Sequence, residues 1–286
     1  MARALAAGCS ESSAGAGTAW APDADGLRAF AVELAREAMD AIRAGRPTTA
    51  ESTTKADAGD WVTPFDRAVE MQARERIAAR YPAHGFVGEE FGRHERQHDL
   101  EPGIVWHLDP IDGTMNFVHG IPWVAFSLAA ADAGGVVAGA VADVYRGEIF
   151  SASRGGGAWV DQVRARCASP ERLEGGVFLT EWSGQAPWPG MFGYLERIAA
   201  LPAASRIMGS CALALAQVGV GRATGAVLPG RYSTWDVYAG ALIAREGGAV
   251  LYDRHGACDG VPLDGVLAAP PQVARRLWEA WTANTT

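Results

Sequence analysis

The fold is decided by the stretch Trp106-His107-Leu108-Asp109-Pro110-Ile111-Asp112-Gly113-Thr114-Met115-Asn116-Phe117. Its apolar start predicts a strand that delivers two carboxylates, Asp109 and Asp112, onto a turn fixed by Pro110 and Gly113. Hard oxygen ligands three residues apart at a strand end suit Mg²⁺, which takes a few carboxylates and keeps several waters. An ordinary Asx turn, in which Asp and Gly only satisfy backbone groups, fits equally well. This stretch alone leaves both interpretations open.

Upstream of this stretch, the apolar residues have the spacing of amphipathic helices. They recur at three- and four-residue steps between Leu27 and Ile42. A second helix is predicted from Thr63, as its N-cap, to Tyr81, with Asp66 placed to complete a capping box. Two helices are therefore expected before the sheet begins.

From residue 104 the pattern changes to short apolar segments separated by Gly-rich turns, which predict strands at residues 104–108, 123–131, 136–142 and 148–151. The second half alternates. Its expected strands are 177–181, 225–228 and two more near Val250 and Val266, and its expected helices are 191–200, 210–220, 235–246 and 272–281. The chain is therefore assigned to the α+β class, with mixed layers of helices and sheets.

The chain is expected to form one domain, residues 25–286, after a flexible leader at residues 1–24 that is rich in Gly, Ala and Ser. Within the domain, an α+β half at about 25–165 and an α/β half at about 166–286 are expected to share one core.

The charge balance argues against nucleic acid as a partner. The net charge is -8, whereas nucleic-acid affinity depends on clustered Lys and Arg. Only one of the 25 basic residues is a lysine, Lys55. No apolar run reaches the roughly 18 residues of a membrane span. The 4 cysteines form no CxxC pair, which favours a reducing, cytoplasmic location.

Other carboxylates lie at the ends of predicted elements. Glu89 and Glu90 close a short strand, and Asp236 opens a helix. Each has a simple structural interpretation when taken singly: Asp66 as a capping-box partner, Asp236 as a first-turn acid favoured by the helix dipole, and Glu90 as a solvated neighbour. None of them identifies a metal site alone.

Taken together, these segments resemble the inositol-monophosphatase family, whose marks are a Gly-Glu-Glu strand end, an Asp-Pro-Ile-Asp-Gly-Thr turn and a later Trp-Asp. The resemblance runs from about residue 25 to 281. It also includes Lys55, Asp60, Val62-Thr63, Asp66, Asn116-Phe117, and the Gly209-Ser210 helix entry before Ala212. An ordered set of this kind is far more specific than a lone motif.

The resemblance implies a layered αβαβα sandwich that binds two or three Mg²⁺ ions. The implied metal ligands are Glu89, Asp109, Asp112, Asp236 and the carbonyl of Ile111. The implied catalytic residues, which orient and deprotonate a metal-activated water, are Glu89, Thr114 and Asp66. The implied substrate-binding residues are Gly113, Thr114, Asp112, Ser210, Arg231 and Asp236. Lys55 and Asp60 are expected on a loop near the site.

The implied activity is that of a phosphoric monoester hydrolase, a homodimer inhibited by Li⁺ and Ca²⁺, that acts on a cyclitol, sugar or nucleoside phosphate. One departure bears on the substrate. Seven positions before Asp236 the family places a Glu that binds substrate hydroxyls, and this chain has Pro229. Arg231 is a candidate reader of a second anionic group, or a solvated loop cation. Histidinol phosphate and nucleotide 3′-phosphates are alternative substrates from the same superfamily.

Rival classes fit less well. A haloacid-dehalogenase phosphatase needs an Asp nucleophile where Pro110 stands, two residues before Asp112, and a later basic residue, but no lysine follows Lys55. A P-loop needs a Gly-Lys pair. The segment His94-Glu95-Arg96-Gln97-His98 matches the zinc-protease string, but it lies in a polar stretch without a helix face to hold it. An inactive scaffold or regulatory homologue is the remaining non-enzyme hypothesis.

Overall fold

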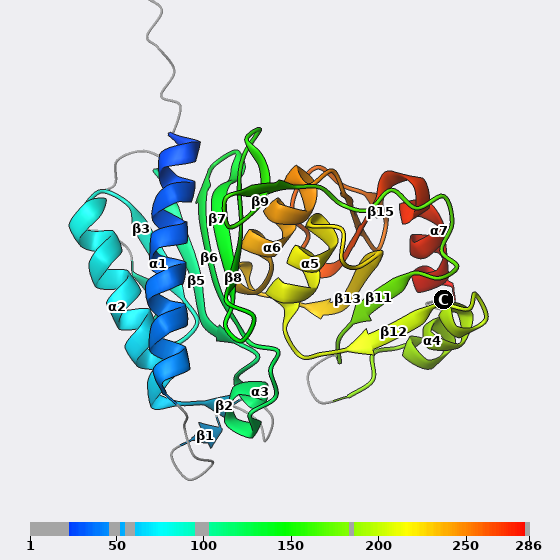
Figure 1. The fold of residues 1–286 in the computed structure, drawn as a ribbon, viewed down its shortest axis with the longest axis horizontal. Coiled ribbons are helices and arrows are strands. Elements are labelled where there is room, and N and C mark those ends of the chain that lie inside the picture. The colour runs from blue at the N-terminus through cyan, green and yellow to red at the C-terminus, as the bar shows by residue number, and fades with distance from the viewer. Residues whose placement is uncertain (1–22, 46–51, 55–60, 95–102, 183–185, 284–286) are drawn as a thin grey trace, which may run out of the picture.

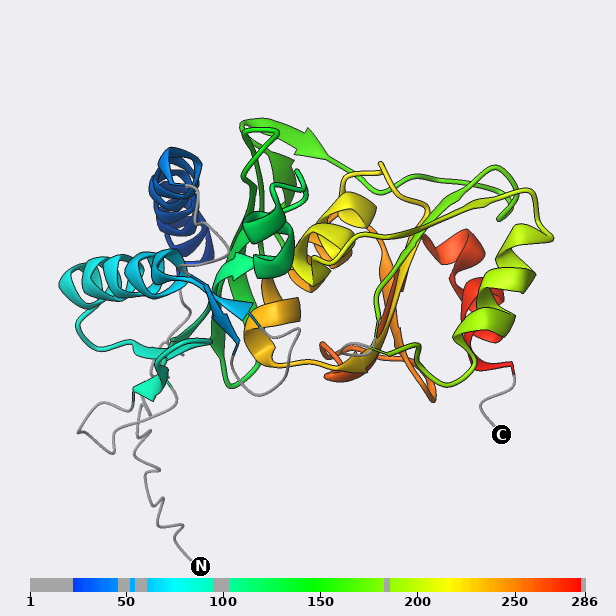
Figure 2. The ribbon, with the colours of Figure 1, turned by 90° about the horizontal axis from the view of Figure 1, so that it is seen from below.

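The computed structural model describes residues 23–45, 52–54, 61–94, 103–182 and 186–283. Its helices and sheets alternate in stacked layers, and both views show the same order (Figures 1 and 2). The outermost helices on one side are α1 (Ala24–Ala44) and α2 (Pro64–Arg80). The helices between the two sheets are α5 (Cys211–Gly219) and α6 (Thr234–Glu246), and those on the far side are α4 (Met191–Ala199) and α7 (Pro271–Thr282). The predicted αβαβα sandwich is therefore confirmed.

The first large sheet of the described chain has the strand order β10-β9-β8-β7-β6-β5-β3-β4. Its strands are β3 (Gly85–Gly88), β4 (Gly92–His94), β5 (Val105–Asp112), β6 (Ala125–Asp132), β7 (Gly135–Asp143), β8 (Glu148–Ser153), β9 (Gly157–Val160) and β10 (Val163–Ala165). All its neighbouring strands are antiparallel except β3 and β5, which run parallel.

The second large sheet has the order β12-β11-β13-β16-β14-β15. Its strands are β11 (Val177–Thr180), β12 (Ala204–Ile207), β13 (Gly225–Arg231), β14 (Val250–Asp253), β15 (Gly256–Ala257) and β16 (Asp264–Ala269). Three small elements complete the described chain: β1 (Thr53–Thr54) paired with β2 (Trp61–Val62), and the short helix α3 (Thr114–His119).

The two predicted N-terminal helices form as their sequence signals indicate. Asp23 caps α1 by accepting the backbone N–H of Gly26 at 2.9 Å, and α1 buries its apolar stripe against strands β6 to β8. The capping box at the start of α2 is present. The Thr63 side chain accepts the backbone N–H of Asp66, and the Asp66 side chain accepts the backbone N–H of Thr63.

The helix α5 shows why two sheets share a middle layer. Every residue from Ala212 to Gly219 is buried, because this helix packs between the sheets and has no solvent-facing side. A helix that is apolar all round requires such a place.

The strand β5 differs from the prediction. We expected Asp109 and Asp112 on a turn after a strand, but β5 continues through Asp112, and its register against β6 shifts between these two residues. Pro110 has no N–H to donate to the ladder, which favours an irregularity at this point. The two carboxylates therefore lie on a bulged strand end.

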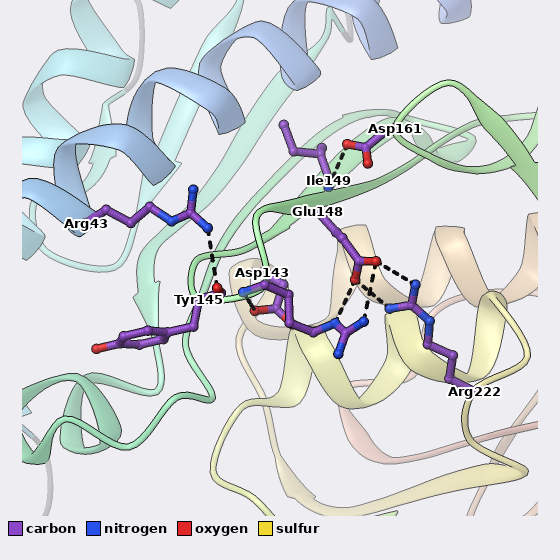
Figure 3. Close-up of polar contacts among 8 residues, drawn as sticks. Arg43, Asp143, Tyr145, Glu148, Ile149, Asp161 and Arg222 are labelled. Atoms are coloured by element: carbon purple, nitrogen blue, oxygen red, sulfur yellow. Dashed lines mark hydrogen bonds and ion pairs between the residues drawn. The ribbon is translucent and has the colours of Figure 1, made fainter.

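Arginines tie the turn between β7 and β8 to distant helices (Figure 3). Arg43, near the end of α1, donates to the carbonyl of Tyr145 at 3.3 Å. Arg222, just after α5, donates to both carboxylate oxygens of Glu148 at 2.6 and 2.8 Å, and Arg146 donates to the same group at 2.7 Å. This turn thus connects the outer helical layer to the middle one.

The structure also bears on the expectations for membrane spans, for the cysteines and for the zinc-protease string. Every helix in the described ranges is too short or too polar to cross a membrane. The cysteines that the structure describes, Cys167, Cys211 and Cys258, are free thiols. His94 ends β4, and the rest of the zinc-protease string lies outside the described residues.

Candidate active site

Parallel pairing of β3 with β5 brings two carboxylates together. Gly88 pairs with Leu108, and the N–H of Glu89 donates to the Leu108 carbonyl at 3.2 Å. The residues that follow these partners, Glu89 and Asp109, therefore lie side by side at the carboxyl ends of their strands. The glycine permits a close approach, since a Cβ at Gly88 would lie 2.0 Å from Glu70 Oε1.

The helix α5 points its first backbone N–H groups at Asp112. Oδ2 of Asp112 accepts from Ser210 Oγ at 2.6 Å and from Ala212 N at 2.7 Å, and Oδ1 accepts from Cys211 N at 3.2 Å. Burial raises the pKa of Asp112 to about 6 even though these hydrogen bonds favour the charged form. The N-terminus of α5 thus holds a carboxylate of the first large sheet.

The carboxyl group of Asp109 is the electrostatic centre of the site. Only 3% of the residue is exposed, and its Oδ1 accepts the Ile111 N–H at 3.0 Å. Burial raises its pKa well above the usual range, and the charges of Glu89, Asp112 and Asp236 raise it further. We call these four residues, Glu89, Asp109, Asp112 and Asp236, the acidic cluster.

The acidic cluster has the donor chemistry of a magnesium site. In the part of the chain that the structure describes, no three His, Cys, Asp or Glu side chains are already arranged as a metal-coordinating group. The donors are nevertheless carboxylates, the hard oxygen ligands that Mg²⁺ prefers, and their mutual repulsion in a buried place is what a divalent cation relieves. The residues therefore fit Mg²⁺ by their chemistry.

Thr114 and Asp66 meet across the edge of this cluster. The hydroxyl of Thr114 lies 3.2 Å from Asp66 Oδ1 and 2.9 Å from the Ile111 carbonyl, so its one proton has two possible acceptors. Asp66 is fully buried, and its other oxygen accepts the N–H and the hydroxyl of Thr63. Burial raises the pKa of Asp66 to about 6, with Glu90 and Glu89 adding to the effect. Asp66 therefore both caps α2 and contacts a predicted catalytic hydroxyl.

Glu70, on α2, is a further buried carboxylate next to the acidic cluster, and no prediction from the sequence included it. Its carboxylate is fully buried and accepts the N–H groups of Glu90 at 2.8 Å and Phe91 at 3.1 Å. It thereby fixes the turn that begins with Glu89. The available signal was its position four residues after Asp66, on the same face of α2.

Asp236 lies in the first turn of α6, where its Oδ2 accepts the Ser233 N–H at 2.7 Å. Asp236 is therefore the first-turn acid that the sequence predicted, it also completes a capping box with Ser233, and its charge acts on Asp109. One residue serves both purposes, as Asp66 does.

The predicted substrate residues are placed differently from one another. Gly113 adopts φ +97° as the N-cap of α3 and packs close to the Gly209 carbonyl. Arg231 ends β13 with its side chain 88% exposed and 3.8 Å from Asp264. Pro229 is buried within β13, where its carbonyl accepts a hydrogen bond from Arg254. Lys55 and Asp60 lie outside the described residues.

The comparisons with known proteins agree with this fold. The chain belongs to the inositol monophosphatase family, whose model matches residues 23–285. Among solved structures, it resembles the extragenic suppressor protein SuhB of Bartonella henselae, with a TM-score of 0.79 and 29% identity over 89% of this chain and 98% of that one. It also resembles Mycobacterium tuberculosis SuhB, with a TM-score of 0.73 and 33% identity over 91% and 97%.

Particular relatives have names of two kinds. The Nus factor SuhB of Pasteurella multocida is 34% identical over 87% of this chain and 92% of its own length. The inositol-1-monophosphatase of Mesorhizobium japonicum is 34% identical over 78% of this chain and 83% of its own. Membership of the family supports a phosphatase of that family, and the first name adds a regulatory alternative.

Proposed function

We propose that this chain is a Mg²⁺-dependent phosphatase that hydrolyses a phosphate monoester of a small polyhydroxylated molecule, such as a cyclitol, sugar or nucleoside. The observation that carries the proposal is the contact of Asp112 with Ser210 and the first N–H groups of α5, inside the acidic cluster. Carboxylates for a cation thus lie at the N-terminus of a helix whose first donors hold one of them, Asp112, in place.

The proposed roles are those that the family resemblance implies for these residues. Glu89, Asp109, Asp112, Asp236 and the Ile111 carbonyl are the proposed ligands of two or three Mg²⁺ ions. When bound, these ions supply a more acidic water and neutralise charge on the phosphoryl oxygens. The proposed substrate contacts are Gly113, Thr114, Asp112, Ser210, Arg231 and Asp236.

The reaction requires one proton to leave the attacking water. We assign the orientation of this water and the acceptance of its proton to Glu89 together with Thr114, whose hydroxyl lies 3.2 Å from Asp66 Oδ1. The water oxygen bonds to phosphorus as the ester P–O bond breaks, and the departing alcohol oxygen takes up a proton. The products are the free alcohol and inorganic phosphate. Pro229 offers no side-chain acceptor to the substrate alcohol, which argues against inositol phosphate as the main substrate.

A second candidate function is a regulatory or scaffold role. It is favoured by one finding, that some relatives of comparable identity are Nus factors by name. Its weakness is that the full acidic cluster and Thr114 are present, whereas an inactive homologue has no need of them. A cytoplasmic homodimer is the proposed assembly and location for either function.

The test is phosphate release, with and without Mg²⁺, from a panel of inositol, hexose, nucleoside and histidinol monophosphates. Mg²⁺-dependent turnover that Li⁺ inhibits is the expected result. Full activity in excess EDTA contradicts the metal mechanism. No turnover of any compound by protein that binds Mg²⁺ favours the regulatory role.

A further inference from the structure

The peptide group between Met208 and Gly209 is held from both sides. Its carbonyl accepts from Asn116 Nδ2 at 2.7 Å, and its N–H donates to Glu181 Oε2 at 2.7 Å. The second proton of the Asn116 amide goes to the Trp123 carbonyl at 2.9 Å. Asn116 and Glu181 are 9% and 6% exposed, so water competes little for these bonds.

This peptide group leads directly into the active-site end of α5. Gly209 adopts φ +82°, and the next residue, Ser210, is the N-cap that donates to Asp112 at 2.6 Å. On the other side, a Cβ at Gly113 would lie 2.9 Å from the Gly209 carbonyl, so the two glycine backbones are in close contact. Rotation of the Met208–Gly209 peptide would therefore move Ser210 away from Asp112.

Packing alone does not fix this turn. Met208 borders a cavity of about 300 Å³, which Trp123 and Leu179 also line. Met208 is also partly buried against the hydrophobic core around α5 and β13, so the hydrogen bonds to Asn116 and Glu181 add to packing in fixing the turn.

The burial of Glu181 at this position lowers the stability of the fold. It is buried, and its second oxygen, Oε1, has no hydrogen-bond partner among the described residues. Burial raises its pKa to about 8, and the charge of Asp112 contributes. A buried carboxyl with an unmatched oxygen destabilises a fold, which points to a functional reason for its presence.

We propose that Glu181 is a positioning residue for phosphate binding: it holds the Gly209 N–H so that Ser210 stays on Asp112 and the Gly209 backbone stays against Gly113. The inference rests on the proposed function, because it assigns Glu181 to the same site. Glu181 itself touches neither substrate nor metal, and it acts through the turn.

The test compares two substitutions of Glu181 whose side chains are similar in length. Glu181→Gln keeps an oxygen that accepts the Gly209 N–H, whereas Glu181→Met removes the acceptor. Glu196→Met, at an exposed position of α4, is the matched control. Inorganic phosphate is titrated into each protein with saturating Mg²⁺ by calorimetry, Mg²⁺ alone is titrated separately, and KM and kcat are measured on any active phosphate ester.

We expect Glu181→Met to weaken phosphate binding about tenfold or more and to raise KM by a similar factor, the scale of one lost buried hydrogen bond. The fall in kcat should be smaller. Glu181→Gln should bind phosphate within about threefold of the wild type. Unchanged phosphate binding in Glu181→Met, or equal damage in both variants, overturns the proposal.

A second measurement does not depend on activity. In ¹⁵N-glycine-labelled protein, the Gly209 amide proton should lie downfield and exchange slowly in the wild type and Glu181→Gln, and should shift upfield and exchange faster in Glu181→Met. An unchanged Gly209 amide signal in Glu181→Met overturns the positioning role. A wild type that binds neither Mg²⁺ nor phosphate contradicts the proposed function, and the amide signal then reports separately on the turn.

Discussion

His107 Nδ1 lies 2.7 Å from Thr234 Oγ1, and this contact joins the strand that carries Asp109 to the helix that carries Asp236. The two residues are 127 positions apart in the chain. The ring of Tyr238 packs against the His107 ring at 4.9 Å and closes the contact from the side of α6. The distance between Asp109 and Asp236 therefore depends on the contact between His107 and Thr234, a tie in which neither acid takes part.

Removal of this tie should loosen the cation site. Thr234→Val keeps the shape of the side chain but not its hydroxyl, so we expect Mg²⁺ affinity to fall about tenfold, as for other residues that orient metal ligands. The free energy of unfolding should fall by about 1 kcal/mol. Calorimetric Mg²⁺ titration and urea denaturation measure the two effects. Thr234→Ser is the control and should restore both, whereas a stability loss without a change in Mg²⁺ affinity would mean that the tie is only structural.

Asp109→Asn should separate folding from function. The variant keeps the oxygen that accepts the Ile111 N–H and puts a neutral amide in place of a buried carboxyl whose pKa is raised by burial and by the charges of Glu89, Asp112 and Asp236. We expect the melting temperature in EDTA to rise, because the folded state loses repulsion that the unfolded chain never had. Turnover should fall by about 10²- to 10³-fold, the scale of losing one preorganised electrostatic group. A lower melting temperature in EDTA would show that Asp109 stabilises the fold by itself.

Some of this arrangement was predictable from the sequence because its signals are local. The first two helices carry their apolar period and their capping residues within a few positions, so Asp66 was placed at the start of α2 correctly. The sandwich followed from the resemblance of ordered motifs. The predicted turn at Asp109 and Asp112 was wrong. A bulged strand end and a turn use similar residues in sequence, and they differ in how the chain pairs with β6.

The supporting residues were not predictable, because their partners are set by tertiary packing. Glu181 reaches Gly209 across 28 positions, and Glu70 reaches Glu90 across 20. In the sequence, Glu181 is only the last residue of an expected strand and Glu70 only another acid on a helix. Burial gives both their significance, and burial follows from how the two sheets enclose α5.

Thr114→Ala tests the assigned catalytic hydroxyl. The side chain is within 3.2 Å of Asp66 and 2.9 Å of the Ile111 carbonyl, which holds it at the edge of the acidic cluster. We expect kcat to fall about 10²-fold if it orients the attacking water. Thr114→Ser retains the hydroxyl and should keep most of the activity. Steady-state kinetics on an active ester decide the point, and kinetics equal to the wild type in Thr114→Ala remove this residue from the mechanism.

The ion pairs of Glu148 should give the fold a pH dependence that can be removed by one substitution. Hydrogen bonds from Arg222 and then Arg146 lower its pKa from 4.5 to about 2, so its contribution to stability is complete above pH 4.5 and disappears as the pH falls toward 2 (Figure 3). Glu148→Gln should therefore lower the free energy of unfolding at pH 7 by about 1 kcal/mol, because the group is partly exposed. Urea denaturation at pH 7, 4 and 3 should show the difference from the wild type shrinking with acidity. Glu279→Gln, which breaks an exposed pair with Arg275 at 3.0 Å, is the control and should change little at any pH. A difference for Glu148→Gln that is as large at pH 3 as at pH 7 would mean that packing, and not charge, joins this turn to α5.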